Sequence, residues 1–167
     1  MSLSDLHNHI LTPFIEHTIQ HLASVGYNAT ASEGFEQQVD NFSCKGYALV
    51  SNTTGVIEGR LLVHHYPETA APLANKLLNK SGDEGEALDD DAINALSEFC
   101  LEAIKPAIAQ LEQSDLEIHF SPTYFIADTK QLGGILDGVK LMLTIPIEVQ
   151  GLGRFYFNYL LNKEINA

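Results

Sequence analysis

The chain has 167 residues, of which 45% are hydrophobic and 19% charged, a composition typical of a folded domain. We expect residues 1–167 to form one domain, large enough to fold without disulfides or a metal. The 22 acidic and 9 basic side chains give a net charge of −13, which argues against nucleic acid or an anionic membrane surface as a partner. A basic or metal-carrying protein is the compatible class of partner.

Neither a targeting segment nor a membrane span is predicted. The first ten residues lack a basic stretch followed by an apolar core, and no apolar run is long enough to cross a bilayer. Cys44 and Cys100 lack the paired spacing of a zinc site, which favours two free thiols in a reducing compartment. We therefore expect a cytoplasmic protein without membrane insertion.

The first predicted element is a helix. Apolar residues recur at helical spacing after Pro13, which suits the first helical position. Thr12 can cap this helix and Gly26 can close it. Residues 3–11 are compatible with an earlier turn.

Three strand-like segments follow this helix. They lie at residues 35–42, 44–53 and 55–66, and the last of them alternates and is rich in branched side chains. The stretch from Asn52 to Gly55 predicts a hairpin turn between the second and third segments.

A short helix is predicted next, at residues 67–80. Pro72 fits this helix if Thr69 is its cap, because the amides of the first turn need no helical partner. Residues 81–87 are expected to form a solvated loop.

The longest predicted helix runs from Asp89 to Gln113. Apolar residues recur at helical spacing along most of this length. They are Ala92, Ile93, Leu96, Phe99, Cys100, Ala103, Ile104, Ala107, Ile108 and Leu111. Pro106 should bend the helix, because the carbonyl of Glu102 loses its donor.

The last part of the chain is again strand-like, at residues 115–128, 138–150 and 153–162. The predicted order is therefore α-β-β-β-α-α-β-β-β, and consecutive hairpins imply antiparallel pairing. We expect an α+β fold in which long helices pack on one face of an antiparallel or mixed sheet. Open sheet edges often pair between subunits, which predicts a homodimer.

The 7 histidines are the first candidates for chemistry. His17 and His21 are four residues apart on the first helix and could hold one metal, but nothing completes a metal motif. No metal site is therefore predicted. His64 and His65 end a strand and are expected at the surface, and His119 is expected to be structural.

The polar face of the long helix is the stronger candidate. Asn94, Glu98 and Glu102 are spaced four apart, and Asp91 lies one turn before Asn94. An amide beside a carboxylate on a rigid helix could position a water for attack on a phosphoryl group. The same spacing also describes a solvated helix face, and the pattern by itself leaves both interpretations open.

Several segments, taken in order, resemble the CheX/CheC family of chemotaxis phosphatases, and the single-unit CheX type most closely. They are the first helix after Pro13, the hairpin and helix after Gly46, the start of the long helix at Asp89, and the Ser-Pro-Thr segment at Ser121. The resemblance spans about residues 13–128 and implies the α+β fold of that family.

The resemblance also implies a function. Members of the family remove the phosphoryl group from an aspartate of a response-regulator receiver domain such as CheY. Their long helix inserts a glutamate and, three residues later, an asparagine whose amide orients the attacking water. The magnesium ion belongs to the regulator, so the resemblance implies a receiver domain as the partner and no cofactor of the chain's own.

This chain departs from the family pattern at that catalytic pair. Alignment of Asp91 with the family's helix start puts Ala95 at the glutamate position and Glu98 at the asparagine position. Asn94 then points about 100° away from the expected glutamate. The candidate catalytic residues are Glu98 and Asn94, and the candidate partner contacts are Asp91, Ala95 and Glu102.

The substitution at Glu98 predicts a change of activity. Its carboxylate would be repelled by an acyl phosphate, and it cannot donate to phosphate while accepting from water, as an amide can. We expect weak or lost phosphatase activity with receiver binding retained. The alternative is a non-catalytic interaction module, such as a scaffold or a protein like those of the flagellar switch. A metal or small-ligand sensor built on His17 and His21 is a weaker third hypothesis.

Overall fold

The computed structural model describes residues 2–39, 42, 46–80, 88–127 and 134–162. Its helices are α1 (Leu3–Asp5), the π-helix η1 (Leu6–Leu11), α2 (Thr12–Ser24), α3 (Pro67–Leu77) and α4 (Asp90–Glu112). Its strands are β1 (Ala29–Ala31), β2 (Phe35–Gln37), β3 (Tyr47–Gly55), β4 (Gly59–His65), β5 (Ile118–Phe120), β6 (Tyr124–Ile126), β7 (Leu141–Val149) and β8 (Gly153–Leu161). Cys44 and the loop predicted at residues 81–87 lie outside the described residues.

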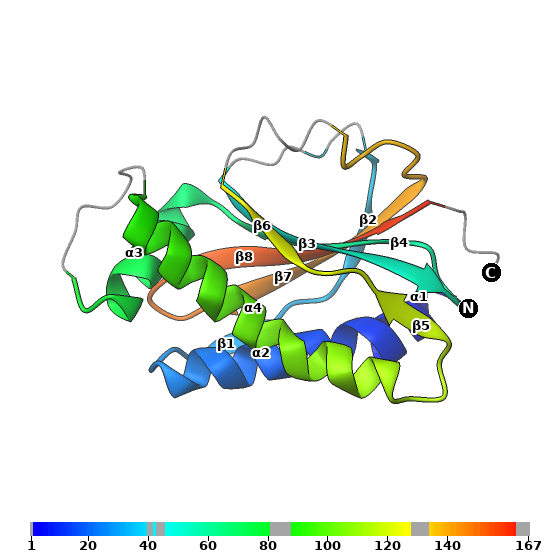
Figure 1. Cartoon of the computed structure of the whole chain (residues 1–167), viewed down its shortest axis with the longest axis horizontal. Helices are drawn as coiled ribbons and strands as arrows, with labels where there is room; N and C mark the ends of the chain where they lie inside the picture. Colours follow the sequence, from blue (N-terminus) through cyan, green and yellow to red (C-terminus); the bar gives the residue numbers. More distant parts are fainter. Residues whose placement is uncertain (1, 40–41, 43–45, 81–87, 128–133, 163–167) are drawn as a thin grey trace.

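One antiparallel sheet joins all these strands. The order is β1-β7-β8-β4-β3-β5, with β2 also paired to β7 and β6 to β3. Helices α2 and α4 lie side by side across one face of the sheet, with α3 at one end of α4 (Figure 1). The predicted α+β fold, with its helices on one face of an antiparallel sheet, is confirmed.

The central strands place side chains alternately on the two faces of the sheet, as the pleat of a β-strand requires. On the helical face, residues such as Val63, Ile145 and Phe157 join the main core with α2 and α4. On the opposite face, Leu62, Met142 and Leu160 belong to a second, smaller cluster. The sheet therefore has two buried sides, and the described helices cover one of them.

The first helical region is longer than the predicted helix, because α1 and η1 lead directly into α2. The predicted cap at Thr12 is therefore wrong: its hydroxyl donates to the carbonyl of His7 at 3.0 Å, within a continuous helical run. Gly26 closes the helix as predicted. It adopts a φ of +94°, and the amide of Tyr27 bonds back to the carbonyl of Leu22.

Helix α4 has the extent that its apolar pattern predicts. Asp89 is the N-cap, and its Oδ1 accepts a hydrogen bond from the amide of Ala92 at 2.8 Å. Leu96 and Ala107 of the apolar pattern are fully inaccessible, and Ile93 and Ile108 at its edges are half-buried. The helix continues past Pro106 to Glu112.

Two predicted local features are wrong. Asn52 pairs with Arg60 and Gly55 still belongs to β3, so the connection to β4 lies at residues 56–58. The first residue of α3 is Pro67, so Thr69 is not its cap. The Thr69 hydroxyl instead donates to the carbonyl of Arg154 in β8 at 3.0 Å, which links the helix to the sheet.

The structure has two strands more than the predicted order. Strand β1 was not predicted, and it forms because residues 29–31 pair with the end of β7. The segment at 115–128 is split into β5 and β6, which both pair with β3 on either side of Ser121. Of the strand predicted at 35–42, residues 35–37 form β2, and residues 40–41 lie outside the described part of the chain.

The cap at Asp89 provides a test of how α4 is held. We expect Asp89→Ala to lower the free energy of unfolding by about 1 kcal/mol, because the amide of Ala92 loses its acceptor. Asp90→Ala, one residue further on, removes a carboxylate without removing that bond and should cost less. Urea unfolding measures both values, and equal losses would contradict the assigned cap.

Candidate functional site

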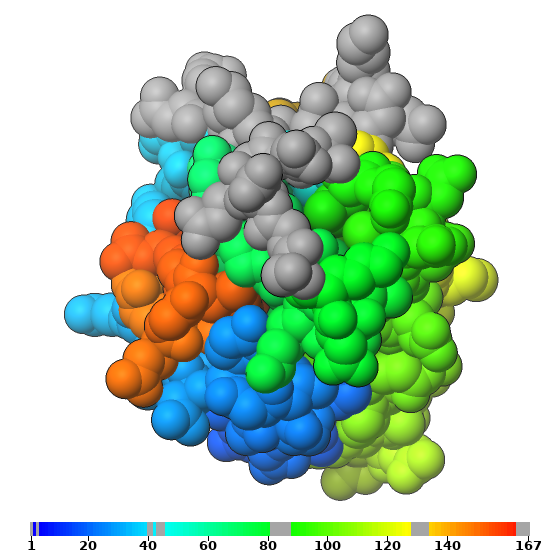
Figure 2. Space-filling model, turned by 90° about the vertical axis from the view of Figure 1, so that its left-hand side faces the viewer, coloured from blue at the N-terminus to red at the C-terminus, as the bar shows by residue number. Residues whose placement is uncertain are grey.

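The predicted site residues lie on the outer side of α4. Asp91, Asn94, Glu98 and Glu102 are exposed, and Ala95 is half-buried. Figure 2 shows α4, in green to yellow-green, along the right-hand side of the molecule with its outer surface open. The four polar side chains are therefore available to a partner in the structure described.

The helix register decides which of these residues share a direction. Steps of four, three and four residues place Asp91, Ala95, Glu98 and Glu102 on one stripe. We call these four residues the α4 stripe. Asn94 lies at its edge, about 100° around the helix from Ala95 and one turn from Glu98.

The α4 stripe is acidic and has a cation near one end. Lys105 Nζ lies 2.7 Å from Oε1 of Glu102, and both side chains are largely exposed. The hydrogen bond and the charge of Lys105 hold the pKa of the Glu102 carboxyl below its usual range. The stripe thus presents carboxylates from Asp91, Glu98 and Glu102, and Ala95 adds only a methyl group.

The helix beneath the stripe is fixed by apolar packing. Leu96 and Phe99, which the family alignment places in the core, are 0% and 8% exposed. Side chains three and four residues apart share a face of the helix. Burial of Leu96 and Phe99 therefore also fixes the direction in which the α4 stripe points. The outward direction of Glu98 is therefore set by the core and does not depend on a loop.

The histidines predicted as a possible metal pair have other neighbours. His17 Nε2 lies 3.2 Å from Oε1 of Gln110 in α4, and the ring of His21 lies 4.4 Å from that of Phe99. Within the described part of the chain, no three histidine, cysteine, aspartate or glutamate side chains come together as a metal site. His119 is exposed on β5.

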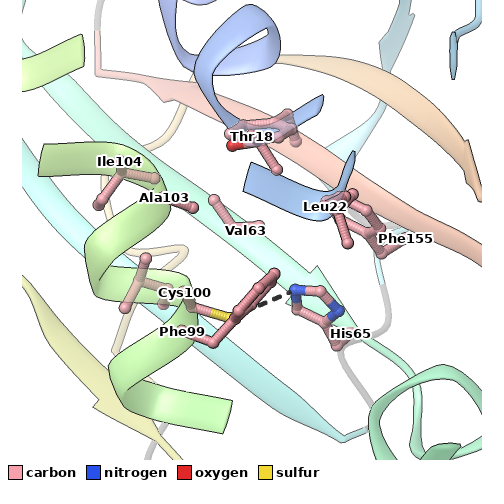
Figure 3. A pocket seen from close by; sticks show the side chains of 11 residues that line it. Thr18, Leu22, Val63, His65, Phe99, Cys100, Ala103, Ile104 and Phe155 are labelled. Carbon is pink, nitrogen blue, oxygen red and sulfur yellow. Dashed lines mark hydrogen bonds between the residues drawn. The ribbon is translucent and has the colours of Figure 1, made fainter. Parts of the chain in front are cut away.

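The predicted surface position of His64 and His65 is wrong. Both are buried, with 1% and 4% exposure, and successive residues of β4 point to opposite faces. His65 faces the helices, and its Nε2 lies 3.7 Å from the Sγ of Cys100 (Figure 3). The alternation of residues 59–65 is the sequence signal from which this inward direction could have been read.

The His65–Cys100 pair lines a small apolar pocket between α2, α4 and the sheet, together with Thr18, Phe99 and Phe155 (Figure 3). Burial lowers the pKa of His65 to about 3, with a further contribution from His64, and burial raises the pKa of the Cys100 thiol to about 12. Both groups are neutral at pH 7. Burial therefore disfavours a thiolate at Cys100, and the pair lies among apolar side chains.

Comparisons with known proteins identify the fold. No family model matches the chain, and no curated protein matches it by sequence. Among solved structures, it is similar to CheX in a CheX–CheY–BeF3–Mg²⁺ complex from Borrelia burgdorferi, with a TM-score of 0.64, 17% identity, and coverage of 92% of this chain and 98% of that one.

Two further structures broaden the comparison. A CheC-like superfamily protein from Shewanella sp. PV-4 has a TM-score of 0.68 at 13% identity and covers 96% of this chain and 98% of its own. FliY from Thermotoga maritima has a TM-score of 0.67 at 16% identity and covers 96% and 91%. The chain thus has the fold of the CheX and CheC-like chemotaxis proteins, as its ordered sequence motifs predicted.

The burial of His65 predicts a pH dependence of stability. The unfolded chain takes up a proton at the ordinary histidine pKa of 6.5, whereas the folded chain does so only near pH 3. This contribution to stability is complete above pH 6.5 and is lost as the pH falls below it, at up to about 1.4 kcal/mol per pH unit.

Urea unfolding of the wild type and of His65→Leu between pH 7 and pH 5 tests this contribution. The difference in unfolding free energy between the two should change with pH by about 1 kcal/mol per unit below pH 6.5. His119→Leu, at an exposed position, should follow the wild type. Parallel curves for the wild type and His65→Leu would contradict the assignment.

Proposed function

We propose that this protein binds a phosphorylated response-regulator receiver domain through the α4 stripe and removes its phosphoryl group slowly or not at all. The observation that carries the proposal is the exposed stripe on a helix whose register is fixed by Leu96 and Phe99. One similar structure is of CheX in a complex with CheY, which supports a receiver as the class of partner.

The charges of the stripe fit such a partner. Asp91, Glu98 and Glu102 present carboxylates, and a receiver domain carries a lysine and a magnesium ion beside its phosphoryl group. Attraction to these cations favours association, and complementary charge acts mainly on the rate and specificity of binding. The metal belongs to the partner, and such a partner implies a cytoplasmic location.

The same residues limit catalysis. The family pair requires a carboxylate three residues before an amide, and this chain has Ala95 and Glu98 in those places. A carboxylate at Glu98 can accept from water but cannot donate to the phosphoryl oxygens. Asn94 has the required amide and stands three residues after the carboxylate of Asp91, but it lies one helical turn before the place of the family's asparagine. Binding without efficient turnover is the consequence.

Charge reversal on the stripe tests the binding proposal. Glu102→Lys should weaken the affinity for a receiver domain in its BeF3–Mg²⁺ form by about tenfold or more, because a carboxylate of the stripe assigned to partner contact becomes a cation. Glu16→Lys makes an equal change of charge at an exposed position of α2 and should change the affinity by less than about twofold. Calorimetry with a panel of receiver domains measures both. Absence of binding to every receiver would refute the proposal.

Restoration of the family pair tests the catalytic part. The double variant Ala95→Glu with Glu98→Asn places a carboxylate and an amide three residues apart, and we expect it to increase phosphate release from a bound phosphorylated receiver by about tenfold or more over the wild type. Phosphate release under single-turnover conditions measures the change. Fast release by the wild type that disappears in Glu98→Ala and Asn94→Ala would overturn the assignment of weak activity.

The second candidate function is a non-catalytic interaction module associated with the flagellar motor. It is favoured by similarity to FliY and to FliM, the latter in a FliM–SpeE complex from H. pylori, with a TM-score of 0.64 at 13% identity. The homodimer remains a prediction from the sequence. The strands at the two sheet edges, β1, β2, β5 and β6, are three residues long each, and short edge strands offer little backbone for pairing between subunits.

A further inference from the structure

A second surface of the molecule has the features of a ligand site. A pocket of about 230 Å³ lies on the face of the sheet that the described helices leave uncovered, away from α4. In Figure 1, β2 rises on this side of the sheet, opposite the helices. The described residues that line the pocket are Phe35, Gln37, Phe42, His64, Tyr66, Thr144, Tyr156 and Asn158.

The floor of the pocket is a chain of hydrogen bonds from the half-buried Gln37 through the buried side chains of Thr144 and Asn158. Nε2 of Gln37 donates to Oγ1 of Thr144 at 2.9 Å, and that hydroxyl donates to Oδ1 of Asn158 at 2.8 Å. Nδ2 of Asn158 donates to the carbonyl of Leu62 at 3.3 Å. Thr144 and Asn158 are 2% and 1% exposed, so their orientation is set before any ligand arrives.

The walls of the pocket are aromatic. The ring of His64 lies 4.6 Å from Tyr66 and 6.1 Å from Phe42, and Tyr66 lies 5.8 Å from Tyr156 in an edge-on arrangement. Phe35 is 48% exposed at the level of β2. Aromatic walls around a few convergent polar groups are the usual composition of a small-molecule site.

The part of the same sheet face next to the pocket is covered by other residues. There, Leu62, Met142 and Leu160 form a buried cluster with Ile135, and Leu136 and Val139 pack against it. Arg60 adds a hydrogen bond from its guanidinium to the carbonyl of Ile135. Two residues further along β4 and β7, the side chains on this face change from apolar Leu62 and Met142 to polar His64 and Thr144. The pocket opens at that point.

The charge of the lining restricts the ligand. No lysine, arginine, aspartate or glutamate is among the described residues that line the pocket. The nearest charges along β7 and β8, Glu148 and Arg154, form an ion pair with each other, and Arg154 also interacts with the side chain of Tyr156, which lines the pocket. Burial of a charged ligand group without a partner is costly, whereas an uncharged ring with donors and acceptors suits amides, a hydroxyl and aromatic faces.

We propose that this pocket binds a small, uncharged, hydrogen-bonding heteroaromatic compound, with the Gln37–Thr144–Asn158 chain as its polar contact and Tyr66 and Tyr156 as its walls. The site is separate from the α4 stripe because the sheet lies between them. The proposal therefore goes beyond receiver binding and does not depend on it.

Titration of the ¹⁵N-labelled protein with nicotinamide, adenine and uracil as probes tests the site. At least one probe should shift the side-chain amide signals of Gln37 and Asn158 and saturate with a Kd of about 1 mM or tighter. Nicotinate, which matches nicotinamide in shape but carries a charge, should bind about tenfold more weakly or not at all. Saturable shifts confined to other residues, or none with any probe, would refute the proposal.

Two variants locate the binding. Thr144→Val keeps the shape but breaks the hydrogen-bond chain, and Tyr156→Leu removes a wall; each should weaken the probe that binds by about tenfold. Thr30→Val, at an exposed position on β1, is the matched control and should not change the affinity. The amide spectrum of each variant reports whether it is folded. Unchanged affinity in folded Thr144→Val and Tyr156→Leu would place the ligand elsewhere.

Discussion

The structure depends on the fact that β4, β7 and β8 are buried on both faces. Alternate side chains of such a strand point to opposite faces of the sheet. A shift of the strand pairing by one residue would therefore exchange the side chains of the two faces. On one side the strands meet α2 and α4 in the main core, and on the other they form a smaller apolar cluster followed by a polar pocket. The adjacent residues His64 and His65 illustrate this division. One lines the open pocket, and the other packs against Cys100 beneath the helices.

The same packing determines what α4 can offer to a partner. Burial of Leu96, Phe99 and Ala107 leaves no freedom in the rotation of the helix, so the outward residues are fixed by their positions in the sequence. The core therefore fixes the outward direction of Asn94 and Glu98, and Ala95 stays half-buried beside them.

Much of the fold could be predicted from local pattern. The boundaries of α4 followed from its long apolar repeat and from Asp89, and the antiparallel pairing followed from successive hairpins. Features that rest on a partner distant in sequence were missed. Strand β1 exists only because β7 lies beside it, and Thr69 bonds to Arg154, 85 residues away. The turn after β3 was misplaced because Asn52 and Gly55 resemble turn residues but are held in the strand by β4 and β5.

Local sequence was sufficient for the α4 stripe, because all its members lie on one helix and helical spacing alone relates their directions. The pocket on the other face could be found only in the folded chain. Gln37, Thr144 and Asn158 come from three strands, and the hydrogen bonds between them span up to 107 residues. Sheet pairing brings such residues together, and no periodicity along the chain records that pairing.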